Sequence, residues 1–245
     1  MSGVYEKEYK LTSSDVNKWQ RLRTSTLMRW LQEAAIAHTE QLGMGREKTL
    51  DKGILWILTM QRVEVLRMPV YDEQILVRSW PGKTMHVFFP RYYEIVTKET
   101  GELLLRASAL WMLLDQKTRR FVFPENAGIV IEGAECGREI ALPTAPKGLP
   151  LTEEKPFAVP FSYVDLNGHM NNTRYFDLAD DLLPFEQEGR LLSAIAVEYQ
   201  HEIREGQEAL LKWGLNEDRT AAFLSGSDAS GSSLFRMRLD YKPSP

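Results

Sequence analysis

The chain has 245 residues, 43% of them hydrophobic and 26% charged, ordinary values for a folded protein that exclude collagen-like, disordered and disulfide-scaffold classes. Its net charge of −4 argues against a general nucleic-acid binder, because such proteins carry a basic surface. Residues 1–145 hold 20 Lys and Arg against 18 Asp and Glu, whereas residues 146–245 hold 10 against 16. The N-terminal part should therefore repel an acidic partner less.

The N-terminal half predicts a strand, a helix and then four strands. The first segment alternates in polarity from Tyr5 to Leu11, as a strand with one buried face does. A helix that stops near Gly43 is indicated by apolar side chains at helical spacing, namely Leu27, Met28, Trp30, Leu31, Ala34, Ala35 and His38. Apolar and β-branched runs predict strands over residues 54–65, 75–80, 86–97 and 103–115.

A change of texture divides the chain into modules over residues 1–140 and 157–245. Between them we predict a linker, residues 141–156, because residues that interrupt regular structure gather there: Pro143, Pro146, Gly148, Pro150 and Pro156. The same order of elements then recurs. We predict a strand over 157–164, a helix over about 172–183, and strands near 193–205, 208–216, 220–227 and 232–241.

An internal repeat accompanies this order. Val63-Glu64 and Val197-Glu198 are separated by 134 residues, and the same shift brings the run 75–78 over the run 209–212. One helix followed by antiparallel strands, repeated, predicts two α+β modules in which a sheet wraps around one apolar helix.

We expect a cytoplasmic protein. The single cysteine, Cys136, cannot form an internal disulfide. The first 15 residues are charged and alternating, unlike a signal peptide, and Glu6 and Glu8 are unlike a transit peptide. The longest apolar runs fall short of the roughly 18 residues needed to span a bilayer. Neither membrane insertion nor a nucleic-acid partner is therefore expected.

The strongest local signal for chemistry is the segment 165–172, directly before the second helix. If it is extended, Asp165, Asn167 and His169 project from one face, which gathers a carboxylate, an amide and an imidazole. A helix N-terminus beside them would favour a developing oxyanion. An equally supported interpretation is a turn at Asn167-Gly168 followed by a helix cap at Asn171 or Asn172.

Other polar residues give weaker signals. Within a strand, Glu202 would share one face with Glu198 and Gln200, which the residues alone indicate as a solvated polar face. His38 lies on the apolar side of the first helix and is expected to be a packed core histidine. No Cys and His set has zinc spacing, and no glycine-rich loop or Gly-x-Ser-x-Gly elbow is present. We therefore expect neither a metal nor a cofactor.

Taken together, these segments resemble the acyl-acyl carrier protein thioesterases over nearly the whole chain. The resembling stretches are Thr26–Glu33, Gly53–Gln61, Thr100–Glu102 with Arg106–Ser108, Thr118–Arg120, Asp165–Asn172 and Glu198–Glu202. The resemblance implies two tandem hot-dog modules of the α+β class. It also implies hydrolysis of the thioester between a fatty acyl chain and the phosphopantetheine arm of an acyl carrier protein.

Carried over by position, the catalytic network of this family would be Asp165, Asn167, His169 and Glu202. Plant members have a cysteine directly after the glutamate, but this chain has Ile203, so a carboxylate must attack the thioester or activate water. We expect Asp165 and Glu202 to lie near one another across the thioester, with Asp165 nearest its carbonyl. Glu202 and His169 would then position water and Asn167 the oxyanion. The reverse assignment of the carboxylates stays open.

The resemblance places the acyl chain in the N-terminal module and the chemistry in the C-terminal one. The candidates for contact with the acyl chain are Leu27, Met28, Leu31, Trp56 and Met60. Docking of an acidic carrier would use basic residues of the N-terminal half, with Arg119 and Arg120 as first candidates, followed by Arg62, Arg67 and Arg91. A homodimer is compatible with this scheme. The alternatives are an acyl-CoA thioesterase and a non-catalytic acyl-binding protein.

Overall fold

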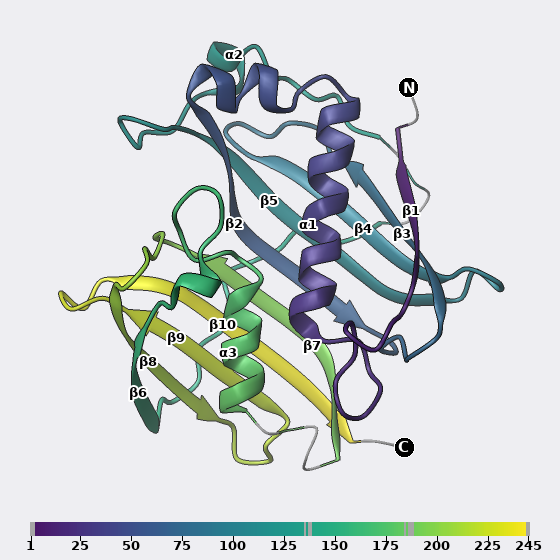
Figure 1. Ribbon diagram of the computed structural model, residues 1–245, viewed down its shortest axis with the longest axis vertical. Coiled ribbons are helices and arrows are strands. Elements are labelled where there is room, and N and C mark those ends of the chain that lie inside the picture. Colours follow the sequence, from purple (N-terminus) through teal and green to yellow (C-terminus); the bar gives the residue numbers. More distant parts are fainter. Residues whose placement is uncertain (1–2, 135, 137–138, 184, 186–188, 244–245) are drawn as a thin grey trace. The chain divides into compact units, whose positions relative to one another are not determined.

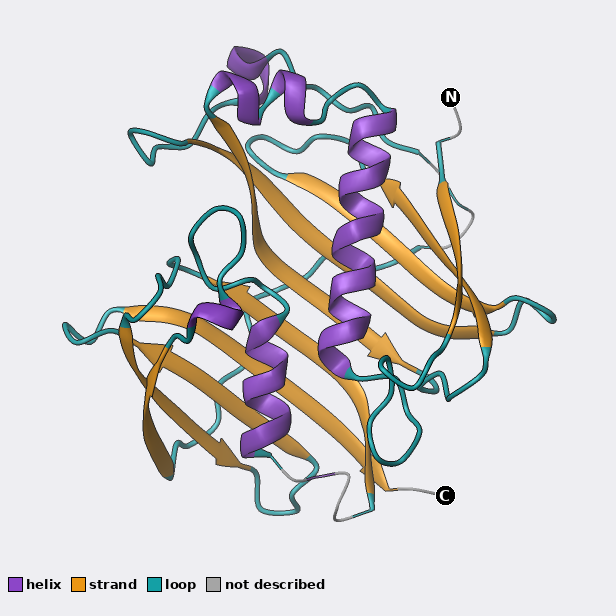
Figure 2. Ribbon diagram, in the orientation of Figure 1, coloured by secondary structure: helices purple, strands orange, loops and turns teal. Residues whose placement is uncertain are grey.

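The computed structural model describes residues 3–134, 136, 139–183, 185 and 189–243. It consists of two compact units, Met1–Pro143 and Thr144–Pro245, here the N-terminal and C-terminal units (Figure 1). Each unit combines antiparallel strands with one principal helix, as the sequence predicted (Figure 2).

In the N-terminal unit, strands pair antiparallel in the order β1-β3-β4-β5-β2, and α1 lies over one face of that sheet (Figure 1). The elements in chain order are β1 (Tyr5–Lys10), α1 (Thr24–Gln41), 3₁₀ turns at Arg46–Lys48 and Leu50–Lys52, β2 (Ile54–Val65), β3 (Gln74–Pro81), β4 (Phe89–Thr97), β5 (Leu103–Asp115) and the short α2 (Pro124–Ala127).

The helix α1 is held to the sheet by its apolar side. Leu27 and Leu31 are fully buried, and each contributes about 1.5–3 kcal/mol by leaving water. His38 is also buried, which confirms its prediction as a packed core histidine. The helix ends at Gln41, and Gly43 then adopts a left-handed conformation (φ 69°) that a side chain would disfavour.

The two faces of the N-terminal sheet can be told apart from contacts and register. Arg91 on β4 is hydrogen-bonded to His38 on α1, so the side chain of Arg91 lies on the face of the sheet that faces the helix. Arg91 pairs with Ala109 on β5, which in turn pairs with Gln61 on β2, so these residues share that face. On each strand, the residues directly before and after these positions point to the opposite side, here called the far face.

On the far face, one row of side chains alternates in charge across the strands from β1 to β2. Register places these residues opposite one another in the order Glu6, Arg78, Glu94, Arg106 and Glu64. Arg78 Nε donates to Glu6 Oε1 at 2.7 Å, and Arg106 donates to both oxygens of Glu64 at 2.9 and 3.0 Å. Opposite charges placed directly across a ladder favour this register over others.

The C-terminal unit has strands in the order β6-β8-β9-β10-β7, also antiparallel, with α3 against the sheet (Figure 1). The ring of Tyr175 on α3 packs edge-on against Phe235, with centroids 4.7 Å apart. The elements are β6 (Glu153–Ala158), a 3₁₀ turn (Phe161–Tyr163), α3 (Arg174–Leu182), β7 (Arg190–Tyr199), β8 (Glu208–Leu215), β9 (Ala221–Ser227) and β10 (Ser233–Pro243).

The predicted repeat is confirmed in the pairing of the strands. The strand order of the two units corresponds element by element, and β3 and β8 are offset by the same 134 residues. The row of charges recurs as well, in the order Glu154, Lys212, Ser225, Arg236 and Glu198. Lys212 Nζ lies 3.1 Å from Glu154 Oε2, and Arg236 Nε donates to Glu198 Oε2 at 2.9 Å.

Two predicted strands are wrong in their bounds. The strand expected over 157–164 is β6, which begins at Glu153 inside the predicted linker; Pro156 is tolerated because β6 stands last in the strand order. The strand expected over 193–205 ends at Tyr199. Residues 200–204 leave the sheet, so Glu202 lies on no strand face.

Candidate functional site

The polar segment before α3 folds as a tight turn. The amide of Gly168 donates to the carbonyl of Asp165 at 3.0 Å, and the amide of Asp165 donates to the carbonyl of His169 at 2.9 Å. Gly168 takes a left-handed conformation (φ 78°), which suits glycine at this place in a turn. The extended form that would align Asp165, Asn167 and His169 on one face is therefore wrong, and the alternative of an Asn-Gly turn is confirmed. The helix cap expected at Asn171 or Asn172 is wrong, because the N-cap of α3 is Thr173.

Within this turn, Asp165 acts on its own backbone. Its Oδ1 accepts a hydrogen bond from the amide of Asn167 at 2.8 Å, the usual way in which aspartate closes a turn. Asn167 is exposed at the tip, and Leu166 beside it is 87% exposed. The turn thus presents Asn167 outward and leads the chain back toward His169.

His169 and Glu202 meet at the base of this turn. His169 Nε2 lies 3.2 Å from Glu202 Oε2, and the two side chains are 14% and 31% exposed. An imidazole and a carboxylate in contact, reachable from solvent, form a pair that can accept and return a proton. Of the predicted network, these two side chains are brought into direct contact, 33 positions apart in sequence.

Glu202 reaches this position because the chain is anchored on either side of it. After β7, the amides of Gln200 and His201 both donate to the carbonyl of Leu234, at 2.9 and 3.0 Å. His201 Nδ1 also lies 2.9 Å from the carbonyl oxygen of Ser233. Beyond Glu202, the carbonyl of Ile203 accepts from the amide of Met170 at 2.7 Å, which joins the segment to the turn.

Ile203 and the start of α3 complete the surroundings. Ile203, the residue that follows Glu202, is 1% exposed. Asn171 Oδ1 accepts from the amide and hydroxyl of Thr173 at 2.9 and 2.8 Å, and this closes the turn that precedes the helix. The Tyr199 hydroxyl donates to the carbonyl of Asn172 at 3.0 Å, and burial raises the pKa of Tyr199, so it stays a donor.

The acyl-chain candidates fall on two different faces of the N-terminal sheet. Leu27, Met28 and Leu31 are buried on α1. Trp56 packs edge-on against Phe89 and donates to the carbonyl of Met44 at 3.3 Å. A register irregularity between Leu58 and Met60 shifts the alternation of β2, so Met60 pairs with Leu110 on the far face. Met60 is therefore not on the α1 side with the others.

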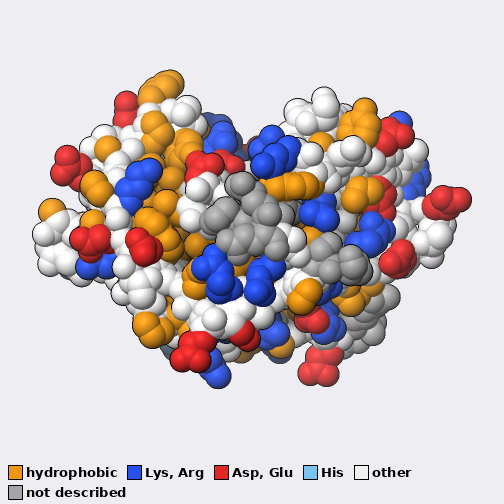
Figure 3. All heavy atoms as spheres, turned by 90° about the horizontal axis from the view of Figure 1, so that it is seen from below, with side chains coloured by type: hydrophobic (Ala, Val, Ile, Leu, Met, Phe, Trp, Pro, Cys, Tyr) orange, Lys and Arg blue, Asp and Glu red, His pale blue; other side chains and the backbone are white. Residues whose placement is uncertain are grey.

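The docking candidates are also unequal. Arg119 and Arg120 are exposed after β5, and Arg62 is exposed on the far face. Arg67 is bound by Glu73 at 2.7 Å. Arg91 is only 4% exposed, so its prediction as a docking residue is wrong. On the face drawn in Figure 3, Lys and Arg are interspersed with Asp and Glu, without dominance of one sign.

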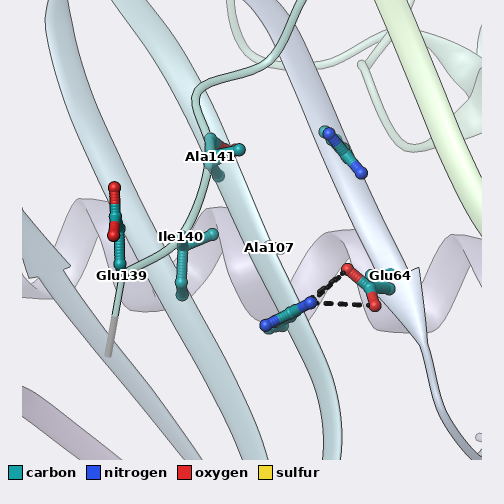
Figure 4. Close-up of a pocket in the computed structure, with 8 residues that line it drawn as sticks. Glu64, Ala107, Glu139, Ile140 and Ala141 are labelled. Atoms are coloured by element: carbon teal, nitrogen blue, oxygen red, sulfur yellow. Dashed lines mark hydrogen bonds and ion pairs between the residues drawn. The ribbon is translucent and has the colours of Figure 1, made fainter. Parts of the chain in front are cut away.

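A hollow of about 250 Å³ opens on the far face of the N-terminal sheet (Figure 4). Its wall includes the ion pair between Glu64 on β2 and Arg106 on β5, the strand that also carries Ala107; Figure 4 labels Glu64 and Ala107. Ser108 donates to the carbonyl of Ala141 at 2.7 Å and so ties the covering segment 139–141 to β5. The hollow belongs to the N-terminal unit, whereas His169 and Glu202 belong to the C-terminal unit.

The described residues contain no group of three or more His, Cys, Asp or Glu placed to hold a metal ion. No helix among them is long and apolar enough to cross a membrane.

Comparisons with known proteins agree over both units. The family model described as the acyl-ACP thioesterase N-terminal domain matches residues 2–125, and that of the C-terminal domain matches residues 149–242. A chloroplastic palmitoyl-acyl carrier protein thioesterase of Gossypium hirsutum is 26% identical over 85% of the chain. A chloroplastic acyl-acyl-carrier-protein hydrolase of Cuphea viscosissima is 24% identical over 97%. The chain spans 54% and 60% of the lengths of these relatives.

Solved structures show the same fold. An acyl-ACP thioesterase from Bacteroides thetaiotaomicron has a TM-score of 0.83 at 19% identity and covers 99% of this chain and 100% of its own. The 12:0-ACP thioesterase from Umbellularia californica has a TM-score of 0.83 at 20% identity, covering 99% and 98%. The fold is thus a tandem hot-dog fold of the α+β class, as the resemblance implied.

Proposed function

The chain belongs to the acyl-ACP thioesterase family, and from this membership we propose that it hydrolyses fatty acyl-acyl carrier protein thioesters to free fatty acid and carrier thiol. The observation that carries the proposal is the contact of His169 Nε2 with Glu202 Oε2 at 3.2 Å, beside a solvent-exposed turn. It supplies the acid-base pair that hydrolysis needs in a chain that lacks a thiol after Glu202.

In the proposed reaction, Glu202 and His169 hold a water molecule and take up its proton as its oxygen attacks the thioester carbonyl carbon. The carbonyl oxygen becomes an oxyanion, for which Asn167 and the N-terminal turn of α3 are the candidate donors. When the oxyanion collapses, the carbon–sulfur bond breaks, and the pair returns the proton to the departing thiolate. Asp165 stands nearest the carbonyl in this scheme. With Asp165 as nucleophile instead, its carboxylate displaces the thiolate and forms a mixed acyl anhydride, and water then cleaves this anhydride to release the fatty acid and restore Asp165.

The division of labour between the units is part of the proposal. The acyl chain would lie along the buried side of α1, against Leu27, Met28, Leu31 and Trp56, while the C-terminal unit carries out the chemistry. Arg119 and Arg120 would dock the acidic carrier. We place the reaction in cytoplasmic fatty acid biosynthesis, since a protein with one cysteine has no internal disulfide to lose in a reducing compartment.

The test compares palmitoyl-carrier protein with palmitoyl-CoA and follows thiol release from each. We expect release from the carrier substrate, at a higher kcat/KM than from CoA. Faster hydrolysis of the CoA substrate would make the protein an acyl-CoA thioesterase instead. Binding of acyl chains without thiol release, over a range of chain lengths and on both carriers, would leave only the non-catalytic alternative.

A further inference from the structure

Arg91 is a buried cation whose bonded partners are all neutral. Its Nη1 lies 3.1 Å from His38 Nδ1 and 3.1 Å from Ser79 Oγ, and its Nη2 lies 3.1 Å from Thr39 Oγ1. Since a guanidinium only donates, His38 Nδ1 accepts and the imidazole is neutral. No Asp or Glu pairs with Arg91 anywhere in the described part of the chain.

This arrangement gives the guanidinium no negative partner among the described residues. All three of its hydrogen bonds go to side chains without a negative charge. Burial lowers the pKa of Arg91, because the charged form has lost water without gaining a negative partner. Arginine nevertheless stays protonated in proteins, so the charge remains.

A second polar side chain, Gln61, is buried on the same face and is 4% exposed. Register places it on the helix-facing side, one strand beyond Ala109, which pairs directly with Arg91. Gln32 on α1 adds a buried Oε1 without a partner in the described part of the chain. A buried oxygen without a hydrogen-bond partner, like that of Gln32, is uncommon in folded interiors.

We propose that Arg91 binds the carboxylate of an aliphatic chain in the N-terminal unit. A carboxylate supplies the missing negative charge and accepts two parallel N–H bonds from a guanidinium. The proposal rests on the proposed function, because the acyl chain of that reaction lies along α1, where a hydrocarbon alone would leave the cation unpaired. Two sources share this chemistry: a released fatty acid that rebinds with its carboxylate end toward Arg91, and an acyl chain with a second carboxylate at its far end.

The first test measures binding rather than turnover. Isothermal titration would compare decanoate with methyl decanoate, which has the same chain without the charge. We expect decanoate to bind at least ten-fold more tightly. The preference should vanish in Thr39→Asp, which places a permanent carboxylate on Nη2, and persist in Thr39→Asn, its neutral match. Arg62→Met, which removes a charge from the far face of the same sheet, is the charge control and should keep the preference.

Stability of the ligand-free variants gives an independent reading. If the cation lacks a counter-ion, Thr39→Asp should melt at a higher temperature than Thr39→Asn, whereas a satisfied site would reverse that order. Should Thr39→Asp fail to fold, Arg91→Gln replaces it, with the same expected loss of preference for the acid. An equal affinity for decanoate and its ester in the unmodified protein, or a preference that survives in Thr39→Asp or Arg91→Gln, overturns the proposal.

Turnover then separates the two sources. Carrier thioesters of decanoic acid and of decanedioic acid differ only at the far end of the chain. Faster hydrolysis of the second assigns the site to the chain end, and equal or slower hydrolysis with retained decanoate binding assigns it to the released product. A protein that hydrolyses neither of these thioesters, nor carrier thioesters of other chain lengths, refutes the proposed function, while the titration still tests the Arg91 site.

Discussion

At the scale of single residues, His169 is the side chain on which the proposed chemistry depends most. It contacts Glu202, it is partly exposed, and it lies outside the buried cores of both units. We expect His169→Ala to lower kcat by about 100-fold or more, the scale of a lost acid-base group. Its melting temperature should stay within a few degrees, as for most substitutions away from the core.

Steady-state kinetics and a thermal melt of the same preparation check this. His86→Ala is the matched control, because His86 is an exposed loop histidine of the other unit. A folded His169→Ala protein with the turnover of the unmodified enzyme would remove His169 from the mechanism.

At the scale of elements, the segment that follows β7 determines where Glu202 points. The bond from His201 Nδ1 to the carbonyl of Ser233 is the last tie to β10 before Glu202. We expect His201→Ala to reduce kcat by about ten-fold with little change in KM, since small displacements of a catalytic group are costly while substrate binding lies elsewhere. His201→Asn should recover most of the loss, because its amide can donate to the same carbonyl. Equal defects in both variants would point to a different role.

The strands show what the sequence pattern can predict. The alternation of apolar and polar residues predicted the bounds of β2, β3 and β5 to within one or two residues, because side chains of a strand with one buried face alternate in polarity. The predicted strand continued past Tyr199, because apolar and polar residues still alternate there. In the structure, the segment after Tyr199 no longer pairs regularly with β10. The register shift at Thr59 could not be predicted from the sequence. An extra residue in β2 moves Met60 to the other face of the sheet, and no residue type around Thr59 signals it.

The candidate site was found in part. Asp165, Asn167, His169 and Glu202 came from residue types and resemblance, but their arrangement came from long-range contacts, which spacing cannot supply. Asp165 closes its own turn instead of standing in line with His169. Arg91 was predicted as a surface charge, because nothing in its strand distinguishes an arginine that faces a helix from one that faces water.

At the scale of the whole molecule, attraction of an acidic carrier should be local. If Arg119 and Arg120 steer the carrier, kcat/KM for the carrier substrate should fall about ten-fold between about 0.05 and about 0.5 M salt, because screening shortens the reach of exposed charges to below about 10 Å. The CoA substrate should respond less. Arg119→Glu with Arg120→Glu should flatten the profile, and Lys155→Glu, an exposed charge in the other unit, should not. Superimposable salt profiles for both substrates would contradict carrier steering.

The matching rows of charge in the two units bear on how the chain folds. Glu64 faces Arg106 in one sheet, and Glu198 faces Arg236 in the other, at equivalent places in the strand order. The same pairing of charges is therefore available between Glu198 and Arg106, which favours mispairing of a strand that folds late. Synthesis from the N-terminus reduces this hazard, because Arg106 is already engaged before Glu198 is made. During refolding from denaturant, all strands are present at once. We therefore expect mispairing between strands of the two units to be the main form of misfolding.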